Sequence, residues 1–156
     1  MGKRTNPDPL SVVASVTDVA QAATKLSLAL YAVSNRILNG PKELTELASE
    51  LSEVSVAIRD LDFLLDRNKK VVRAGLIEIT KEILEKFDAL QKEIRGIIEE
   101  VHESGDSKRL KRIFKHPRVR EVYLELGCLK TLLRLAITTL QVAIEQRKIE
   151  QCAISS

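Results

Sequence analysis

Two neighbouring residues of this chain come close to a known metal-binding pattern. Glu99 and His102 have the Glu-x-x-His spacing that forms one quarter of a di-iron carboxylate site in helical bundles. Such a site also needs a second copy of the pattern and two further inward-facing glutamates, and the sequence does not supply them. Val101 rather than His102 continues the apolar spacing of this segment. We therefore expect His102 to be a solvated histidine at a helix end.

The other histidine and the two cysteines do not form a ligand set either. His116 precedes Pro117 in a basic turn, where a surface position is expected. Cys128 is next to Leu129 and is expected to pack as a small apolar group, whereas Cys152 lies in the C-terminal tail. Their spacing does not make a zinc site, and no glycine-rich phosphate loop or nucleophile elbow is present. The sequence thus predicts a protein that is not an enzyme, with no catalytic residues, metal or cofactor.

A run of positive charge is the strongest surface signal. Residues 107–120 contain no acidic residue and seven basic ones, which are Lys108, Arg109, Lys111, Arg112, Lys115, Arg118 and Arg120. This run is either a solvated face that balances acidic helices beside it or a patch that docks on anionic lipid, where each basic residue contributes about 1 kcal/mol. Nucleic-acid binding is less favoured, because only Phe114 and Tyr123 are close enough to stack on bases.

The segment from Leu10 to Leu38 is the second candidate for function. It carries only three charges, Asp18, Lys25 and Arg36, and at about 100° per residue these fall on one narrow stripe. A packing face with steps of three and four residues lies opposite, formed with Leu10 by Val12, Val16, Val19, Ala23, Leu26, Leu30, Val33 and Ile37. The apolar sector is wider than a surface helix needs, so we expect protein or lipid to surround this helix.

The elements that position these residues are all predicted to be helices. Asp8 is a natural N-cap, and Pro9, Gly40-Pro41 and His116-Pro117 mark helix boundaries. Three further long segments have apolar residues in the same alternation, from Leu44 to Leu65, from Leu76 through Ile79 to Val101 and from Val122 to Ala143. A short basic helix ends before His116. The sequence predicts an all-α antiparallel bundle of four long helices plus one short basic helix, with the first helix central. We expect a flexible basic N-terminus over 1–7, a single bundle domain over 8–150 and a frayed tail over 151–156.

The helix caps and apolar positions also resemble a known family. Residues 8–16, Asp-Pro-Leu-Ser-Val-Val-Ala-Ser-Val, resemble the opening of the fungal HeLo-like and azaphilone-cluster-type N-terminal helical domains of STAND proteins (NOD-like receptors). The resemblance continues through Pro41-Lys42-Glu43-Leu44 and Leu61 to Leu65, and more weakly near Leu110 and Leu129. It implies an α-helical bundle that acts in programmed cell death during nonself recognition (heterokaryon incompatibility), through an N-terminal helix that is released and permeabilises the plasma membrane.

Two functional hypotheses follow. In the first, the chain is a signalling or effector domain of this family: the basic run docks on anionic membrane lipid after activation, and Leu10 to Leu38 leaves the bundle and inserts. In the second, it is a soluble helical protein–protein interaction module or adaptor, whose partner is a helical protein or a second copy of the chain. Two cysteines give no disulfide framework, which favours a cytoplasmic protein, with relocation to the plasma membrane in the first hypothesis.

Overall fold

The computed structural model describes residues 9–37, 40–104 and 106–155, and nearly all of these are helical. The elements, in chain order, are α1 (Pro9–Arg36), α2 (Lys42–Arg67), the short 3₁₀ helix η1 (Lys69–Val71), α3 (Ala74–Glu103), α4 (Ser107–Lys115) and α5 (Pro117–Ser155). The predicted all-α class, with four long helices and one short basic helix, is confirmed. Asp8 and residues 1–7, for which a helix cap and a flexible terminus are expected, lie outside the described residues.

Proline and side-chain caps set several helix boundaries. Pro9 is the first residue of α1, and Pro41 immediately precedes α2, because the fixed φ of proline suits the start of a helix. The carboxylate of Asp106 accepts the backbone N–H of Lys108 at 3.1 Å and thereby caps α4. At the next junction, Nδ1 of His116 accepts the backbone N–H of Arg118 at 3.2 Å at the start of α5. The exposed His116 is thus a structural residue of the α4–α5 turn.

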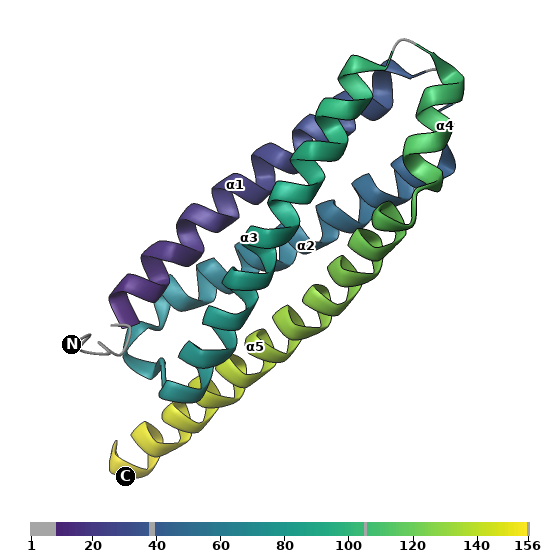
Figure 1. Cartoon of the computed structure of the whole chain (residues 1–156). Coiled ribbons are helices and arrows are strands. Elements are labelled where there is room, and N and C mark those ends of the chain that lie inside the picture. The colour runs from purple at the N-terminus through teal and green to yellow at the C-terminus, as the bar shows by residue number, and fades with distance from the viewer. Residues whose placement is uncertain (1–8, 38–39, 105, 156) are drawn as a thin grey trace, which may run out of the picture.

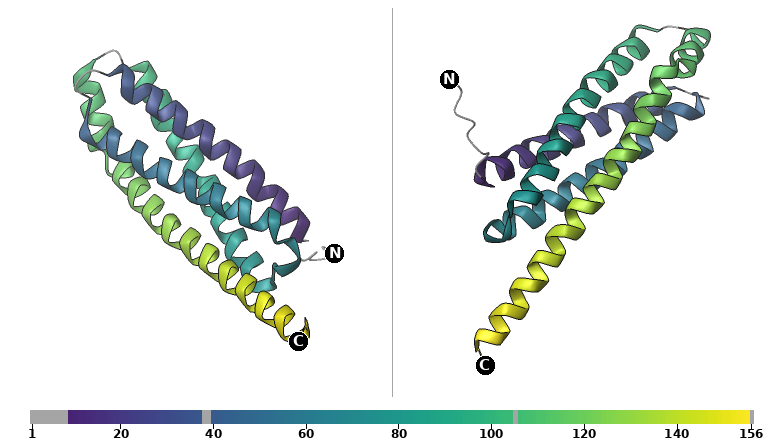
Figure 2. Two further views of the ribbon diagram at one scale, coloured as in Figure 1. Left: turned by 180° about the vertical axis from the view of Figure 1, so that it is seen from behind. Right: turned by 60° about the horizontal axis from the view of Figure 1, so that its bottom comes forward.

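The four long helices form an antiparallel bundle with α1 and α5 at opposite corners (Figures 1 and 2). Helix α1 packs on α2 and α3, and α5 packs on the same two helices, so the order around the bundle is α1, α2, α5, α3. Helix α4 closes one end, and η1 links α2 to α3 at the other. The predicted bundle is confirmed, but the predicted central place of the first helix is wrong: α1 occupies a corner.

The reason for this difference lies in the size of the side chains on α1. Much of its wide apolar sector is alanine, and Ala14, Ala29 and Ala32 are exposed together with Leu28. Alanine has little apolar surface to remove from water, so a helix can expose it at small cost. A wide sector of small residues therefore does not require neighbours on every side.

The core consists of the faces that the three-four spacing predicts. In α2 every position of the predicted face is buried, from Leu44 to Leu65. The predicted faces of α3 and α5 are likewise buried, except for Ile79 and Ala143, which are partly buried. Phe87 lies fully buried among these aliphatic residues. Aliphatic side chains from all four long helices thus form one continuous core.

Small residues bring α1 and α2 close together. Ala20, Ala23 and Ala48 are buried, and the hydroxyl of Ser55 in α2 lies 3.1 Å from the carbonyl oxygen of Ala23 in α1. The same hydroxyl lies 2.8 Å from the carbonyl oxygen of Leu51 in its own helix. A side-chain hydroxyl can reach a neighbouring backbone only where the helices have no large side chains between them. This pair is further joined by Thr17, whose hydroxyl donates to Asp62 at 2.6 Å.

Helix α5 extends beyond the other helices at its C-terminal end (Figures 1 and 2). Its last fully buried residue is Leu140, and the side chains from Lys148 to Ile154 are all exposed. The tail expected at 151–156 is helical through Ser155, with the final residue outside the described part. The α5 backbone thus stays regular where the core no longer covers it.

Candidate functional site

The residues that came closest to a metal pattern lie on the surface of the bundle. Glu99 and His102 are both exposed on α3, as expected for a solvated histidine. Cys128 and Cys152 are exposed on α5, so the prediction that Cys128 packs as a small apolar group is wrong. Within the described residues, no three His, Cys, Asp or Glu side chains gather where they could hold a metal ion.

The residues predicted to insert into a membrane form the inner face of α1. Six of them are buried in the core, namely Val12, Val16, Ala23, Leu26, Leu30 and Val33. Val19 and Ile37 are partly buried against it, and the side chain of Leu10 is outside the described set. Insertion of this face into lipid would therefore require α1 to separate from α2 and α3.

The seven basic residues come together at the end of the bundle that α4 closes. Lys108, Arg109, Lys111, Arg112 and Lys115 are exposed on α4, whereas Phe114 of the same helix is buried in the core. Arg118 and Arg120 continue the basic surface into the first turn of α5. Helix α4 is thus amphipathic, with an apolar side toward the bundle and a basic side toward solvent.

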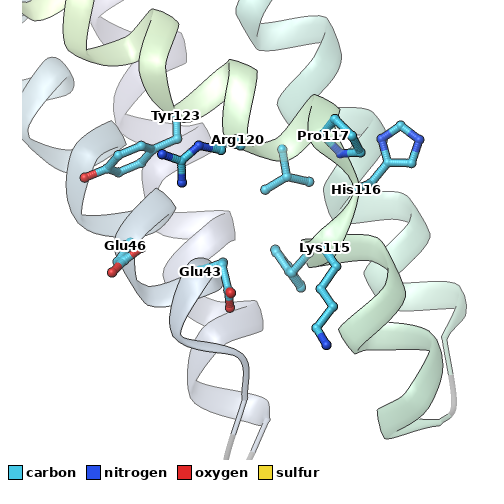
Figure 3. Close-up of a pocket in the computed structure, with 9 residues that line it drawn as sticks. Glu43, Glu46, Lys115, His116, Pro117, Arg120 and Tyr123 are labelled. Carbon is cyan, nitrogen blue, oxygen red and sulfur yellow. The ribbon is translucent and has the colours of Figure 1, made fainter.

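Acidic residues of other helices lie close to part of this basic surface. Arg118 lies 3.5 Å from Glu100 of α3. Glu43 and Glu46 of α2 line a groove of about 380 Å³ together with Lys115 and Arg120. Figure 3 shows these side chains around the groove. Because carboxylates line the same groove as the cations, this part of the basic run cannot act as a simple anion site. The exposed cations of α4 are the part of the basic run that remains as a candidate anion-binding surface.

A second surface feature runs along the outer side of α5. Eight exposed, uncharged residues follow one another in steps of three or four and so lie on one stripe of the helix. We call this stripe the outer seam of α5; it consists of Leu124, Cys128, Thr131, Leu135, Thr139, Val142, Gln146 and Ile149. The large apolar side chains on it are at least half exposed, with values of 51% for Leu135 and 67% for Ile149.

Two threonines make the outer seam more apolar than its composition indicates. The hydroxyl of Thr131 donates to the carbonyl oxygen of Gly127 at 3.2 Å, and that of Thr139 donates to Leu135 at 2.8 Å. Each hydroxyl is thus bonded to the backbone of its own helix one turn earlier. The methyl groups of the two threonines are then the parts left for contact with another molecule.

The composition of α5 is unusual for a helix with so much exposed surface. The stretch from Pro117 to Ile154 is long and apolar enough to cross a membrane, and only 22% of its most apolar window is buried in the bundle. Between Thr131 and Ile144 the single charged residue is Arg134. The sequence predicts one apolar face on this helix, but the structure shows two, of which one faces the core and the other is the outer seam.

The core-facing side of α5 is tied to α2 by a paired cation. Nζ of Lys130 lies 2.8 Å from Glu50 and 2.7 Å from Glu53. Hydrogen bonds to Glu50 and Glu53 raise the pKa of Lys130 above its usual value. The hydrogen bond from Lys130 and its positive charge lower the pKa of Glu53. This pairing holds α5 in a fixed rotation, with the outer seam toward solvent.

Comparisons of the chain with protein-family models, with curated proteins and with solved structures found no match. Function must therefore be argued from the two surface features, which are the basic side of α4 and the outer seam of α5.

Proposed function

We propose that this chain is a non-enzymatic helical interaction module that binds another protein helix along the outer seam of α5. The observation that carries the proposal is the exposed, uncharged stripe from Leu124 to Ile149 on a helix that is already packed on its other side. Exposed apolar stripes of this spacing are the surfaces that a second helix covers in coiled coils and helix-in-groove complexes.

The test is site-specific photocrosslinking in living cells that make the protein. A photoreactive amino acid replaces Leu135 on the outer seam or, as a matched control, Leu28, which is 65% exposed on α1. We expect position 135 to form a crosslink to protein and position 28 to form none. A seam position that yields no protein crosslink under any condition would contradict the interaction function.

Membrane association is the second candidate, and a specific feature of α5 favours it. The apolar window of α5 is long enough to span lipid, and the basic side of α4 could contact anionic headgroups. The resemblance to the fungal cell-death domains supports testing this candidate, with membership in that family still a prediction. We place the lipid-contacting surface on α5 and α4, since α1 uses its apolar face to build the core.

Dye release from vesicles separates the two candidates. If α5 contacts lipid, vesicles that contain anionic lipid should leak, and Val142→Glu should abolish the leakage while Leu28→Glu leaves it unchanged. Neutralising Lys108 and Lys111 should reduce leakage only from anionic vesicles. Absence of leakage from vesicles of every composition would remove the membrane candidate and leave the interaction module.

A further inference from the structure

One flank of the outer seam of α5 carries two opposite charges, and their spacing favours one kind of partner. Arg134 and Glu145 are both exposed, and they are separated by eleven residues. Eleven residues turn an α-helix to within about 20° of its starting direction, so the two charges lie on the same flank of the seam. Their midpoint along the helix is next to Thr139, a seam residue near the middle of the stripe.

In an antiparallel pair of identical helices, two opposite charges on one flank form two equivalent ion pairs. With a twofold axis beside Thr139, Arg134 of each copy lies opposite Glu145 of the other, which gives two symmetric ion pairs. Along the seam, an axis beside Thr139 that places Leu135 opposite Val142 of the second copy also places Cys128 opposite Ile149, and Arg134 then lies within two residues, about 3 Å along the helix axis, of Glu145. At each of these levels a seam side chain of one copy packs against a seam side chain of the other.

A parallel pair is less compatible with the same charges. In a parallel register Arg120 would lie near Glu125 of the second copy, but Glu145 would lie beside Glu150 of the second copy, and Arg134 would have no acidic residue opposite it. Like charges that face each other across a helix pair are unfavourable. Glu145 already lies 3.5 Å from Lys148 of its own helix, and of the two arrangements only the antiparallel one brings Arg134 opposite an acidic residue without placing like charges together.

The protruding end of α5 also suits a second copy. Beyond the bundle, Ile149 and Ile154 are 67% and 85% exposed. In the antiparallel register these last turns lie along the outer seam of the other copy near Cys128 and Thr131. The two protruding ends therefore each cover the part of the partner seam that the middle of the helix cannot reach.

We propose that the chain forms an antiparallel homodimer through the outer seams of α5, with a twofold axis beside Thr139. This inference rests on the proposed interaction function and names the partner as a second copy. It requires no release of α1 and no change in the bundle.

The first test is light scattering on the purified full chain over a series of concentrations. Wild type should reach the mass of a dimer, Leu135→Glu and Val142→Glu should remain monomeric, and Leu28→Glu should behave as wild type. Circular dichroism checks that each variant stays folded, which is expected because all three side chains point to solvent.

The second test concerns orientation. Arg134→Glu and Glu145→Arg should each raise the dimer dissociation constant about tenfold, because each creates two like-charge pairs. Mixing these two single variants should restore wild-type affinity through a heterodimer, in which one ion pair has the original sign and the other has the reversed sign. The double variant should also recover. No recovery on mixing would overturn the antiparallel arrangement.

The failure of this inference can be told apart from the failure of the proposed function. A wild-type chain that is monomeric at all concentrations, while position 135 crosslinks to a different protein in cells, overturns the homodimer and keeps the interaction module. A monomer without any crosslink at position 135 overturns both. A dimer that Leu135→Glu leaves intact overturns this homodimer, because it uses another surface, whereas the crosslink at position 135 still decides the interaction function.

Discussion

At the scale of single residues, one buried polar group lacks the partner that such groups usually have. Thr80 of α3 is 1% exposed, and in the described part of the chain its hydroxyl oxygen has no hydrogen-bond partner. A buried hydroxyl that makes no hydrogen bond loses its interaction with water without replacement. Valine has nearly the same shape and no hydroxyl.

We therefore expect Thr80→Val to stabilise the protein by about 1 kcal/mol. Denaturant unfolding measures this as a higher midpoint with an unchanged slope. Thr24→Val is the control, since the Thr24 hydroxyl already donates to the carbonyl oxygen of Ala20 at 3.0 Å; its effect should stay within about 0.5 kcal/mol. A destabilised Thr80→Val variant would show that the hydroxyl has a partner in solution.

The pairing of Lys130 with Glu50 and Glu53 predicts a dependence of stability on pH. The pKa of Glu53 is lowered in the folded state, so its contribution is present above the ordinary value of 4.5 and is lost as the pH falls through the folded-state value. The pKa of Lys130 is raised, so its contribution is present below 10.5 and is lost as the pH rises through the folded-state value. Lys130→Met should therefore destabilise the protein most between these limits.

Urea unfolding of wild type and Lys130→Met at several pH values tests this expectation. The difference between the two proteins should be constant near neutral pH and should shrink in acid. Lys92→Met, which removes an exposed pair with Asp88 at 3.6 Å, should change stability little at any pH. An equal loss for Lys130→Met in acid and at neutral pH would mean that packing of the side chain, not its charge, is what matters.

At the scale of helices, α5 contains a glycine that its surroundings do not require. A Cβ atom added at Gly127 would lie 3.8 Å from a carboxylate oxygen of Glu50, which is an ordinary contact. Glycine in a helix interior is less favourable than alanine because it loses more backbone freedom on folding. Nothing in the neighbourhood offsets this cost.

Gly127→Ala should accordingly stabilise the chain by about 0.5–1 kcal/mol. Thermal unfolding followed by circular dichroism provides the measurement. Gly96→Ala in α3, where the added atom would lie 3.9 Å from Arg118, should act in the same direction. A lower melting temperature for Gly127→Ala would indicate that α5 needs a closer approach to α2 than the structure shows.

Helix faces were predictable from the sequence, whereas helix neighbours were not. Every position in the three-four spacing from Leu44 to Leu65 is buried in α2, because one side of a helix must be apolar to pack. The same pattern does not state which helix lies opposite, so α1 was expected at the centre and lies at a corner. The exposed alanines of α1 explain the error, because an apolar sector made of small side chains does not need neighbours on every side.

For the candidate sites too, the sequence predicts which residues share a helix face but not which residues of other helices lie beside them. The basic run was predictable as a surface feature, but Glu100, which pairs with Arg118, and Glu43 and Glu46, which line a groove with Lys115 and Arg120, are distant in sequence. The outer seam of α5 was missed because its residues are interleaved with the core-facing ones. A second series of steps of three and four, from Leu124 to Ile149, was the available signal.

At the scale of the whole molecule, the order of helices around the bundle separates two surfaces. Helices α1 and α5 share the neighbours α2 and α3 but occupy opposite corners (Figure 1). Occupation of the outer seam of α5 by a partner therefore leaves the exposed side of α1 open. A dimer through α5 would display two α1 helices on its far sides, so a further partner could bind each copy without competing for the seam.

The protruding last turns of α5 also determine where the chain is open to proteases. A short helical end that the core does not cover is marginally stable in water and unravels often. Trypsin should therefore cut first after Lys148, which is exposed at the start of this end, while Arg147 donates to the carbonyl oxygen of Lys70 at 3.2 Å and is held against the bundle. The rate of that cut then becomes a simple gauge of how often the end of α5 is covered.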